Sequence, residues 1–194
     1  MPESQIDQKP LRPIKWRRWF RRTFLTGPVR RMPRSWRILD IACGYGLFGE
    51  IRQKTVVGIE RDEASLAHSA CIGFPLVRGD ITATLPFRDG AFDAAVAHDV
   101  LEHLTSVENR NLFREVRRVL RPAGTFLIFV PNRKGFELGI RQKVGHVLFV
   151  QRKEIEEFAS GLFSTVHTGS WPLPSFIGDF ANHNKLIACL RRIP

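Results

Sequence analysis

A turn of small residues, followed at a fixed interval by an acidic residue, is the pattern in this sequence with the clearest chemical use. Residues 38–50 read ILDIACGYGLFGE, in which an apolar stretch ends at Ile41 and small residues follow. Such a turn lets the backbone approach a ligand and directs N–H groups at it. Glu60, sixteen residues after Gly44, ends the next apolar stretch. A carboxylate there can accept hydrogen bonds from two ribose hydroxyls, which indicates a nucleoside-containing cofactor.

Asp40 favours one such cofactor over another. A dinucleotide site requires G-x-G-x-x-G to seat a pyrophosphate, whereas this chain has Ala42-x-Gly44-x-Gly46, with Asp40 two residues before Ala42. A carboxylate at this position would repel a pyrophosphate but attract a cation. The residues therefore favour S-adenosylmethionine, with its sulfonium and amino groups, over NAD.

A second group of polar residues lies further along the chain. His98, Asp99, Glu102 and His103 follow an apolar stretch closely. One of them could act as a general base for an O or N nucleophile, since an unperturbed histidine titrates near neutral pH. The group could instead bind a divalent metal, or open the following helix with its histidines packed or solvated. The sequence leaves these three interpretations open.

Apolar stretches alternate with amphipathic ones along the rest of the chain. Seven strands are expected, over residues 37–41, 55–60, 75–77, 92–97, 125–130, 164–168 and 185–190. Helices are expected over residues 47–53, 62–70, 107–120 and 152–160. This order predicts an α/β fold: a Rossmann-like, doubly wound, mostly parallel seven-stranded sheet with helices on both faces and ligands at the carboxyl ends of the strands.

The basic residues are concentrated at the start of the chain. The net charge is +11, and residues 1–37 contain eleven Lys and Arg but only two acids. We expect residues 1–13 to be disordered and residues 14–26 to form an amphipathic helix that Gly27 and Pro28 end. The predicted organisation is a basic arm over residues 1–35 and a cofactor-binding domain over residues 36–194.

The arm has three possible uses. Arginines on one helix face and Trp or Phe on another suit an anionic membrane surface. The same composition could stack on RNA and neutralise its phosphates. The arm could also cover the substrate pocket or contact a second subunit. The oligomeric state is not predictable from these residues.

Four motifs resemble, in order, the type 11 group of class I methyltransferases, which includes relatives in ubiquinone and menaquinone biosynthesis. ILDIACGYG resembles the first motif, and VVGIERDE resembles the second strand with its ribose-binding acid. The segments RGDITATLPFRDGAFDAAVAHDVLEHL (78–104) and REVRRVLRPAGTFLIFVPN (114–132) resemble the parts that follow. One departure is Ala42, where this family usually has Gly, which implies a slightly reshaped site.

The resemblance implies S-adenosylmethionine as cofactor and assigns its contacts. Asp40 would lie near the methionine moiety and Glu60 would hold the ribose. Asp80 would accept from the adenine amine, with Ile81 beside the ring. The other cofactor-binding residues would be Ala42, Cys43, Gly44, Gly46, Arg61 and His98. The tentative catalytic residues, which would face the methyl group and the acceptor, are His98, Asp99 and His103.

The resulting expectation is a methyltransferase for a small-molecule or lipid-like acceptor, without a bound metal. The alternatives are a non-catalytic module that docks on membrane or RNA through its arm, and an RNA methyltransferase. Aromatic residues in 132–150 and 169–184 favour an apolar acceptor. The three cysteines form no C-x-x-C pair, and no apolar run approaches the ~18–20 residues of a membrane span. We therefore expect a cytoplasmic protein, with peripheral contact to an anionic membrane as one alternative.

Overall fold

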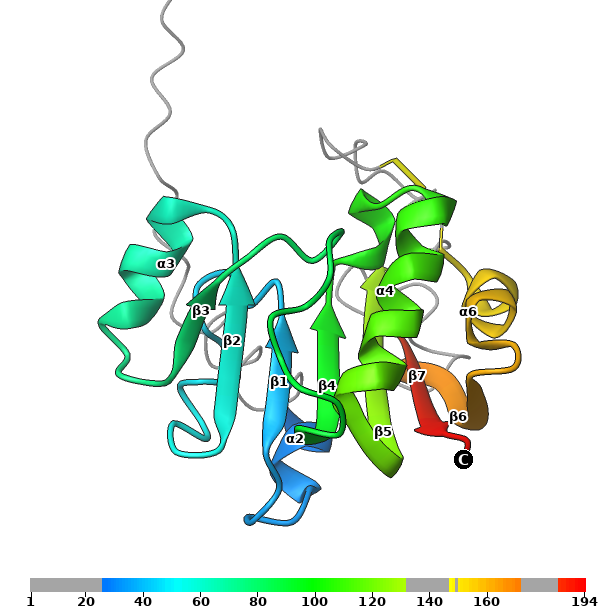
Figure 1. Cartoon of the computed structure of the whole chain (residues 1–194), viewed down its shortest axis with the longest axis horizontal. Helices are drawn as coiled ribbons and strands as arrows, with labels where there is room; N and C mark the ends of the chain where they lie inside the picture. Colours follow the sequence, from blue (N-terminus) through cyan, green and yellow to red (C-terminus); the bar gives the residue numbers. More distant parts are fainter. Residues whose placement is uncertain (1–25, 132–146, 149, 172–184) are drawn as a thin grey trace, which may run out of the picture.

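The computed structural model describes residues 26–131, 147–148, 150–171 and 185–194. These residues build a seven-stranded sheet in the order β3-β2-β1-β4-β5-β7-β6 (Figure 1). The strands are β1 (Ile38–Ile41), β2 (Val56–Glu60), β3 (Leu76–Arg78), β4 (Phe92–His98), β5 (Leu120–Pro131), β6 (Phe163–Trp171) and β7 (Lys185–Arg192).

The sheet is mixed rather than uniformly parallel. The pairs β1–β2, β2–β3, β1–β4 and β4–β5 are parallel, whereas β7 runs antiparallel to both β5 and β6. Every predicted strand is present within a few residues of its expected bounds. The carboxyl ends of the parallel strands meet at one edge, the upper edge in Figure 1.

Two apolar clusters cover the two faces of the sheet. On one face Leu39 and Ile41 of β1 pack with residues of α4 (Ser106–Val119) and α6 (Arg152–Ala159). On the other face Ile38 packs with Val29 of α2 (Gly27–Arg31) and with Phe48. Successive strand residues point to opposite faces, so this alternation follows from strand geometry. Asp40 thus belongs to the α2 face of β1.

The longer helices begin with side-chain caps that the sequence makes available. Asp62 accepts a hydrogen bond from the Ser65 amide and caps α3 (Glu63–Ala70). Thr105 and Glu108 form a reciprocal capping box at the start of α4. No helix in the described part of the chain is both long and apolar enough to cross a membrane.

The prediction of a helix over residues 47–53 is wrong, because the chain there forms successive turns. Gly46 has a positive φ of 74°, and a side chain at Gly49 would meet the Phe74 ring at 2.3 Å. Bonds of helical type remain from Glu50 N to Gly46 O and from Arg52 N to Phe48 O, at 3.0 and 3.1 Å. Closely spaced glycines weaken a helix, so the N–H groups near the site come from a turn and not from a regular helix end.

Proline and glycine also lie at the start of two elements. Gly27 and Pro28 form the first turn of α2, where proline needs no N–H partner. The helix that they are predicted to end lies almost entirely outside the described residues. Pro122 and Gly124 follow the end of α4 at Val119 and lie within β5, which starts at Leu120 and is irregular where Ala123 has a φ of 59°.

Candidate functional site

The glycine turn and the acidic strand end meet, as the spacing predicts. The Gly44 amide donates to Glu60 Oε2 at 2.9 Å, and the amides of Arg61 and Asp62 donate to Glu60 Oε1 at 2.8 and 2.9 Å. Parallel pairing of β1 and β2 brings the two strand ends side by side. Glu60 is 8% exposed. Its carboxylate is held by three backbone donors and retains lone pairs for further donors.

The turn uses left-handed backbone at alternate positions. Ala42, Gly44 and Gly46 have φ values of 50°, 50° and 74°. This conformation is disfavoured for residues with a Cβ atom by roughly 1–2 kcal/mol. Ala42, the one residue that departs from the family pattern, therefore carries strain that glycine would not.

A series of three substitutions separates this strain from packing. We expect Ala42→Gly to stabilise the protein by about 0.5–1 kcal/mol, since relief of left-handed strain exceeds the entropic cost of glycine. Gly44→Ala should destabilise it by a similar amount through left-handed backbone strain alone, because no atom lies within 4 Å of the added methyl. Gly46→Ala should cost more, since its methyl would lie 2.7 Å from Phe74. Urea unfolding midpoints measure all three, and equal values for Gly44→Ala and Gly46→Ala would contradict the packing argument.

Asp40 lies directly behind the turn, at the end of β1. Its side chain is 2% exposed, and Oδ2 has no hydrogen-bond partner among the described residues. Burial raises its pKa well above the ordinary 3.8, and the neighbouring Glu60 carboxylate adds to the increase. A buried oxygen without a donor, close to a second carboxylate, is suited to a cationic group.

Cys43 lies in the turn, and its thiol is protonated and unreactive. Burial, followed by the charges of Asp40 and Glu60, raises the pKa of its thiol from 9.0 to about 12. The Cys43 amide donates to Ile59 O at 3.1 Å, and its sulfur packs against Gly58. Its thiol stays protonated at neutral pH, so Cys43 is not a nucleophile. Its contacts with Ile59 and Gly58 connect the turn to β2.

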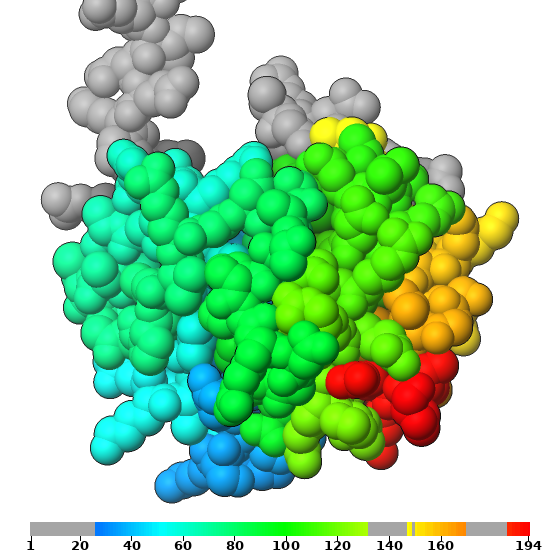
Figure 2. Space-filling view, in the orientation of Figure 1, coloured from blue at the N-terminus to red at the C-terminus, as the bar shows by residue number. Residues whose placement is uncertain are grey.

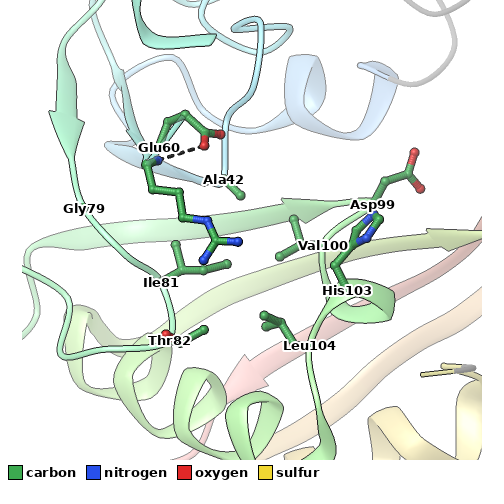
Figure 3. A pocket seen from close by; sticks show the side chains of 10 residues that line it. Ala42, Glu60, Gly79, Ile81, Thr82, Asp99, Val100, His103 and Leu104 are labelled. Carbon is green, nitrogen blue, oxygen red and sulfur yellow. Dashed lines mark hydrogen bonds between the residues drawn. The ribbon is translucent and has the colours of Figure 1, made fainter. Parts of the chain in front are cut away.

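A pocket opens in front of the turn at the carboxyl edge of the sheet. Its cavity volume is about 130 Å³ and it is open to solvent, so it is smaller than the roughly 300–1,000 Å³ typical of small-molecule sites. In Figure 3, Glu60 and Ala42 lie on one side, Ile81 and Thr82 on a second, and Val100 and Leu104 on a third. The lining residues are Ala42, Glu60, Arg61, Gly79, Ile81, Thr82, Asp99, Val100, His103 and Leu104.

Asp80 lies beside this pocket rather than in its lining. Its Oδ1 accepts from the Thr82 amide and hydroxyl at 2.9 and 2.8 Å, and these bonds lower its pKa. Its Oδ2 lies 3.6 Å from an Arg61 guanidinium nitrogen, and both side chains are largely exposed. The pair borders the Ile81 side of the pocket, where Thr82 is a lining residue that the sequence did not indicate.

The wall opposite Glu60 is a short turn held by a buried amide. The 3-10 helix η2 (Leu101–His103) follows β4, and Asn109 of α4 donates to the carbonyls of Leu101, Leu104 and Thr105 at 3.0–3.2 Å. Asn109 is fully buried. It fixes the wall that presents Leu104, a second lining residue without a signal in the sequence.

The predicted catalytic residues do not all line the pocket. His98 lies on the α2 face, with ring contacts to Phe48 and Phe129, and its Nδ1 lies 3.7 Å from Asp99 Oδ2. Asp99 and His103 line the pocket, and His103 is exposed. Asp99 has a φ of 56°, and its carboxylate points away from the pocket centre in Figure 3. His98 is thus the one of the three that does not line the pocket.

The metal interpretation finds no support at this position. Among the described residues, no three His, Cys, Asp or Glu side chains are grouped as metal ligands. Glu102 is 3% exposed, and its carbonyl accepts from the amides of Val147 and Leu148 at 2.8 and 3.1 Å. Its position in the wall favours a structural role for Glu102.

A single arginine clamps the loop that carries the Ile81 side of the pocket. Arg118 of α4 donates to the carbonyls of Leu85 and Phe87 at 2.9 and 2.7 Å, and to Asp89 and Glu115 at 2.8 and 2.7 Å. Glu115 in turn accepts from the Leu85 amide at 2.8 Å. The bond from Arg118 lowers the pKa of Glu115, so the clamp stays ionised at neutral pH.

We expect Arg118→Ala to destabilise the protein by about 2–4 kcal/mol, because two carbonyls and a half-buried carboxylate lose their donor. The freed loop should also weaken cofactor binding. Arg114→Ala is the matched control on the same helix, since exposed Arg114 hydrogen-bonds to Asn111 alone among the described residues. It should change stability by less than about 0.5 kcal/mol. Thermal unfolding and calorimetric titration measure both effects, and equal results for the two variants would refute the clamp.

Several predicted features lie outside the described residues. These are nearly all of the predicted amphipathic helix over residues 14–26 and of the segments 132–150 and 169–184, whose aromatic residues favour an apolar acceptor.

Known proteins that resemble this chain include methyltransferases. A family model described as a methyltransferase domain matches residues 39–128. A probable S-adenosylmethionine-dependent methyltransferase from Mycolicibacterium smegmatis is 36% identical over 108 residues, which are 53% of this chain and 40% of that protein. The chain therefore spans about two fifths of the length of this curated relative.

Solved structures share the fold at low sequence identity. The crystal structure of a Pyrococcus horikoshii protein has a TM-score of 0.71 at 17% identity and covers 95% of this chain and 94% of its own. An S-adenosylmethionine-dependent methyltransferase from Methanosarcina mazei has a TM-score of 0.66 at 17% identity, covering 86% of this chain and 96% of its own. Residues 39–128 thus match a methyltransferase domain and are similar to S-adenosylmethionine-dependent methyltransferases, a similarity that implies S-adenosylmethionine as the cofactor, and the chain shares the fold of a solved methyltransferase.

Proposed function

We propose that the chain transfers the methyl group of S-adenosylmethionine to a small-molecule or lipid-like acceptor by in-line displacement. The observation that carries this proposal is the Gly44–Glu60 contact of 2.9 Å at the edge of a pocket. A carboxylate fixed beside a glycine turn is the arrangement that a ribose diol requires. The orphaned, buried Asp40 Oδ2 behind the same turn fits a cationic ligand.

Four residues of the site would bind or shield the cofactor. When bound, the cofactor supplies an electrophilic methyl group on a positively charged sulfur. Glu60 binds the ribose hydroxyls, and Asp40 stabilises the cationic methionine end. Ile81 and Leu104 exclude water from the adenine side. Catalysis then depends chiefly on holding the acceptor in line with the methyl group.

Of the two tentative histidines, His103 is the better candidate for proton transfer. It lines the pocket and is exposed, whereas His98 is packed against two phenylalanine rings. An acceptor hydroxyl or amine must lose its proton as the methyl group arrives. We infer that His103 takes this proton and that His98 orients Asp99.

The charge around the pocket favours an acceptor that is not a polyanion. The segments 60–63, 78–82 and 98–108, which surround it, contain seven acids and two arginines, a formal charge of −5. Nucleic acid would be repelled from such an opening. This distribution supports a neutral or cationic small acceptor over the RNA alternative.

Calorimetric titration of the full chain with S-adenosylmethionine and, in parallel, with NAD tests the cofactor assignment. We expect saturable binding of S-adenosylmethionine and none of NAD. Release of S-adenosylhomocysteine in the presence of fractionated small-molecule and lipid extracts then tests transfer. Binding without release in any fraction would favour the non-catalytic alternative, and binding of NAD alone would refute the proposal.

A further inference from the structure

The edge of the sheet opposite the pocket carries a concentration of positive charge that the linear sequence does not show. We define this basic edge as residues 27–37, 50–54, 87–93, 114–122 and 190–194, which lie at or near the amino ends of β1, β2, β4 and β5 and the carboxyl end of β7. These segments contain thirteen Lys and Arg and four acids, a formal charge of +9. Nine of these bases are exposed, but only one of the acids is, namely Asp89.

Direct contacts join the segments into one continuous surface. Asp93 accepts from the Arg37 amide at 2.8 Å and pairs with Arg121 at 2.7 Å. Arg52 donates to Pro33 O at 2.6 Å, and Arg117 donates to Pro194 O at 2.9 Å. Figure 2 shows the blue N-terminal segment, the yellow-green start of β5 and the red C-terminus along the lower edge of the molecule.

Four of the thirteen bases are not neutralised by a partner within the described part of the chain. The side chains of Arg34, Lys54, Arg88 and Arg191 are exposed and make no hydrogen bond or ion pair within the described part of the chain. Bases that are close together and unneutralised repel one another, which destabilises the fold unless an anionic partner is gained. The surface therefore has the charge to attract a polyanion.

The chemistry of the edge favours a lipid surface over nucleic acid. Single-stranded nucleic acid is held by exposed aromatic rings on which bases stack. Here Trp36 is only partly exposed and lies under the Arg121 guanidinium at 5.6 Å, and Phe92 is buried below Arg37. The exposed large apolar side chains, Tyr45, Val107, Val147 and Val166, belong to none of the five segments. A broad edge with charge but no stacking rings suits phosphate headgroups in a plane.

The preceding sequence adds positive charge next to this edge. Residues 1–25 contain seven further bases with Trp16, Trp19, Phe20 and Phe24. Trp and Phe between arginines suit both a membrane interface and stacking on RNA, so the choice of a lipid surface rests on the basic edge itself.

We propose that the basic edge docks on an anionic lipid bilayer and holds the cofactor pocket on the side away from it. Long-range attraction would orient the molecule, because the pocket edge is negative and the opposite edge positive. The acceptor would then enter the pocket from water and not from the supporting bilayer. This inference does not depend on catalysis.

The test uses the full chain and vesicles of phosphatidylcholine with and without phosphatidylglycerol. The edge variant Arg34→Ala/Lys54→Ala/Arg88→Ala/Arg191→Ala removes four unpaired charges. The control variant Arg78→Ala/Arg110→Ala/Arg152→Ala/Lys153→Ala removes four exposed charges elsewhere. Because each base near an anionic surface adds roughly fivefold to the partition coefficient, the edge variant should lose at least about 100-fold and the control much less.

Cosedimentation at low and high salt gives the partition coefficients, and circular dichroism verifies that both variants are folded. Binding to anionic vesicles that salt abolishes and the edge variant lacks supports the proposal. Equal binding by the edge variant and the wild type overturns it, since residues 1–25 would then account for the contact. No vesicle binding, or edge-dependent binding of a single-stranded RNA in its place, also overturns it.

Discussion

Glu60→Gln should reduce the affinity for S-adenosylmethionine by on the order of 10²–10⁴-fold, the largest effect expected of any single substitution in this chain. Glu60 accepts from the Gly44, Arg61 and Asp62 amides, and we propose that it also accepts from two ribose hydroxyls. Hydrogen bonds to a charged acceptor contribute about 1.5–3 kcal/mol each. A glutamine would also turn an NH₂ group toward backbone donors or toward the ribose. Isothermal titration calorimetry measures the change.

Glu63→Gln is the matched control for this experiment. Glu63 lies three residues away in α3, is 75% exposed in its side chain and pairs with Arg78 at 2.8 Å. It loses the same charge without touching the pocket, so its affinity should stay within about threefold of wild type. If Glu60→Gln binds as tightly as Glu63→Gln, the ribose assignment is wrong.

Asp40→Asn should have opposite effects on stability and on binding. The folded-state pKa of Asp40 is raised above its ordinary value, chiefly by burial. The wild type therefore loses stability as pH rises from about 3.8 through the raised pKa. Over this range Asp40 ionises freely in the unfolded chain, whereas in the folded protein it must stay protonated or become charged in a buried position. Asparagine carries no such cost, so the ligand-free variant should melt at a higher temperature at neutral pH. Each kcal/mol regained corresponds to roughly 2–4 °C in a domain of this size.

The same substitution should weaken binding by about tenfold or more, since a cation loses a buried carboxylate. Binding to the wild type should release a proton, because a cationic ligand favours ionised Asp40. Calorimetry in two buffers of different ionisation enthalpy measures that proton, and it should disappear in Asp40→Asn. Glu156→Gln, on α6, is the control and should preserve both proton release and affinity. An unchanged proton count in Asp40→Asn would show that another group titrates.

The two edges of the sheet together describe a polarised molecule. The body after residue 37 has nineteen bases and seventeen acids and is nearly neutral by composition. The fold nevertheless gathers thirteen of all the bases at the edge away from the pocket, and seven acids around the pocket. A charge count along the chain cannot show this, because parallel strands bring all their amino ends to one side and all their carboxyl ends to the other.

The cofactor end of the site was predictable from sequence because its contacts are local. Asp40, Gly44 and Glu60 lie within one strand–turn–strand unit, and parallel pairing of two adjacent strands is sufficient to bring the turn and the acid together. The parallel pairing of the core strands follows from the same alternation of strands and helices. The helix expected after Gly46 is replaced by turns because closely spaced glycines, one of them with a positive φ, weaken a helix, while Phe74, distant in sequence, occupies the space beside Gly49.

The acceptor side was decided by tertiary structure. Whether His98, Asp99 or His103 reaches the pocket depends on the left-handed Asp99 and on η2, which buried Asn109 holds in place. Thr82 and Leu104 line the pocket only because Arg118 and Asn109, both on α4, position their loops. Side-chain directions after a strand end are set by such long-range hydrogen bonds and not by local propensity. The sequence by itself therefore determined which cofactor the turn suits, and the packing of α4 against the sheet determined which residues face it.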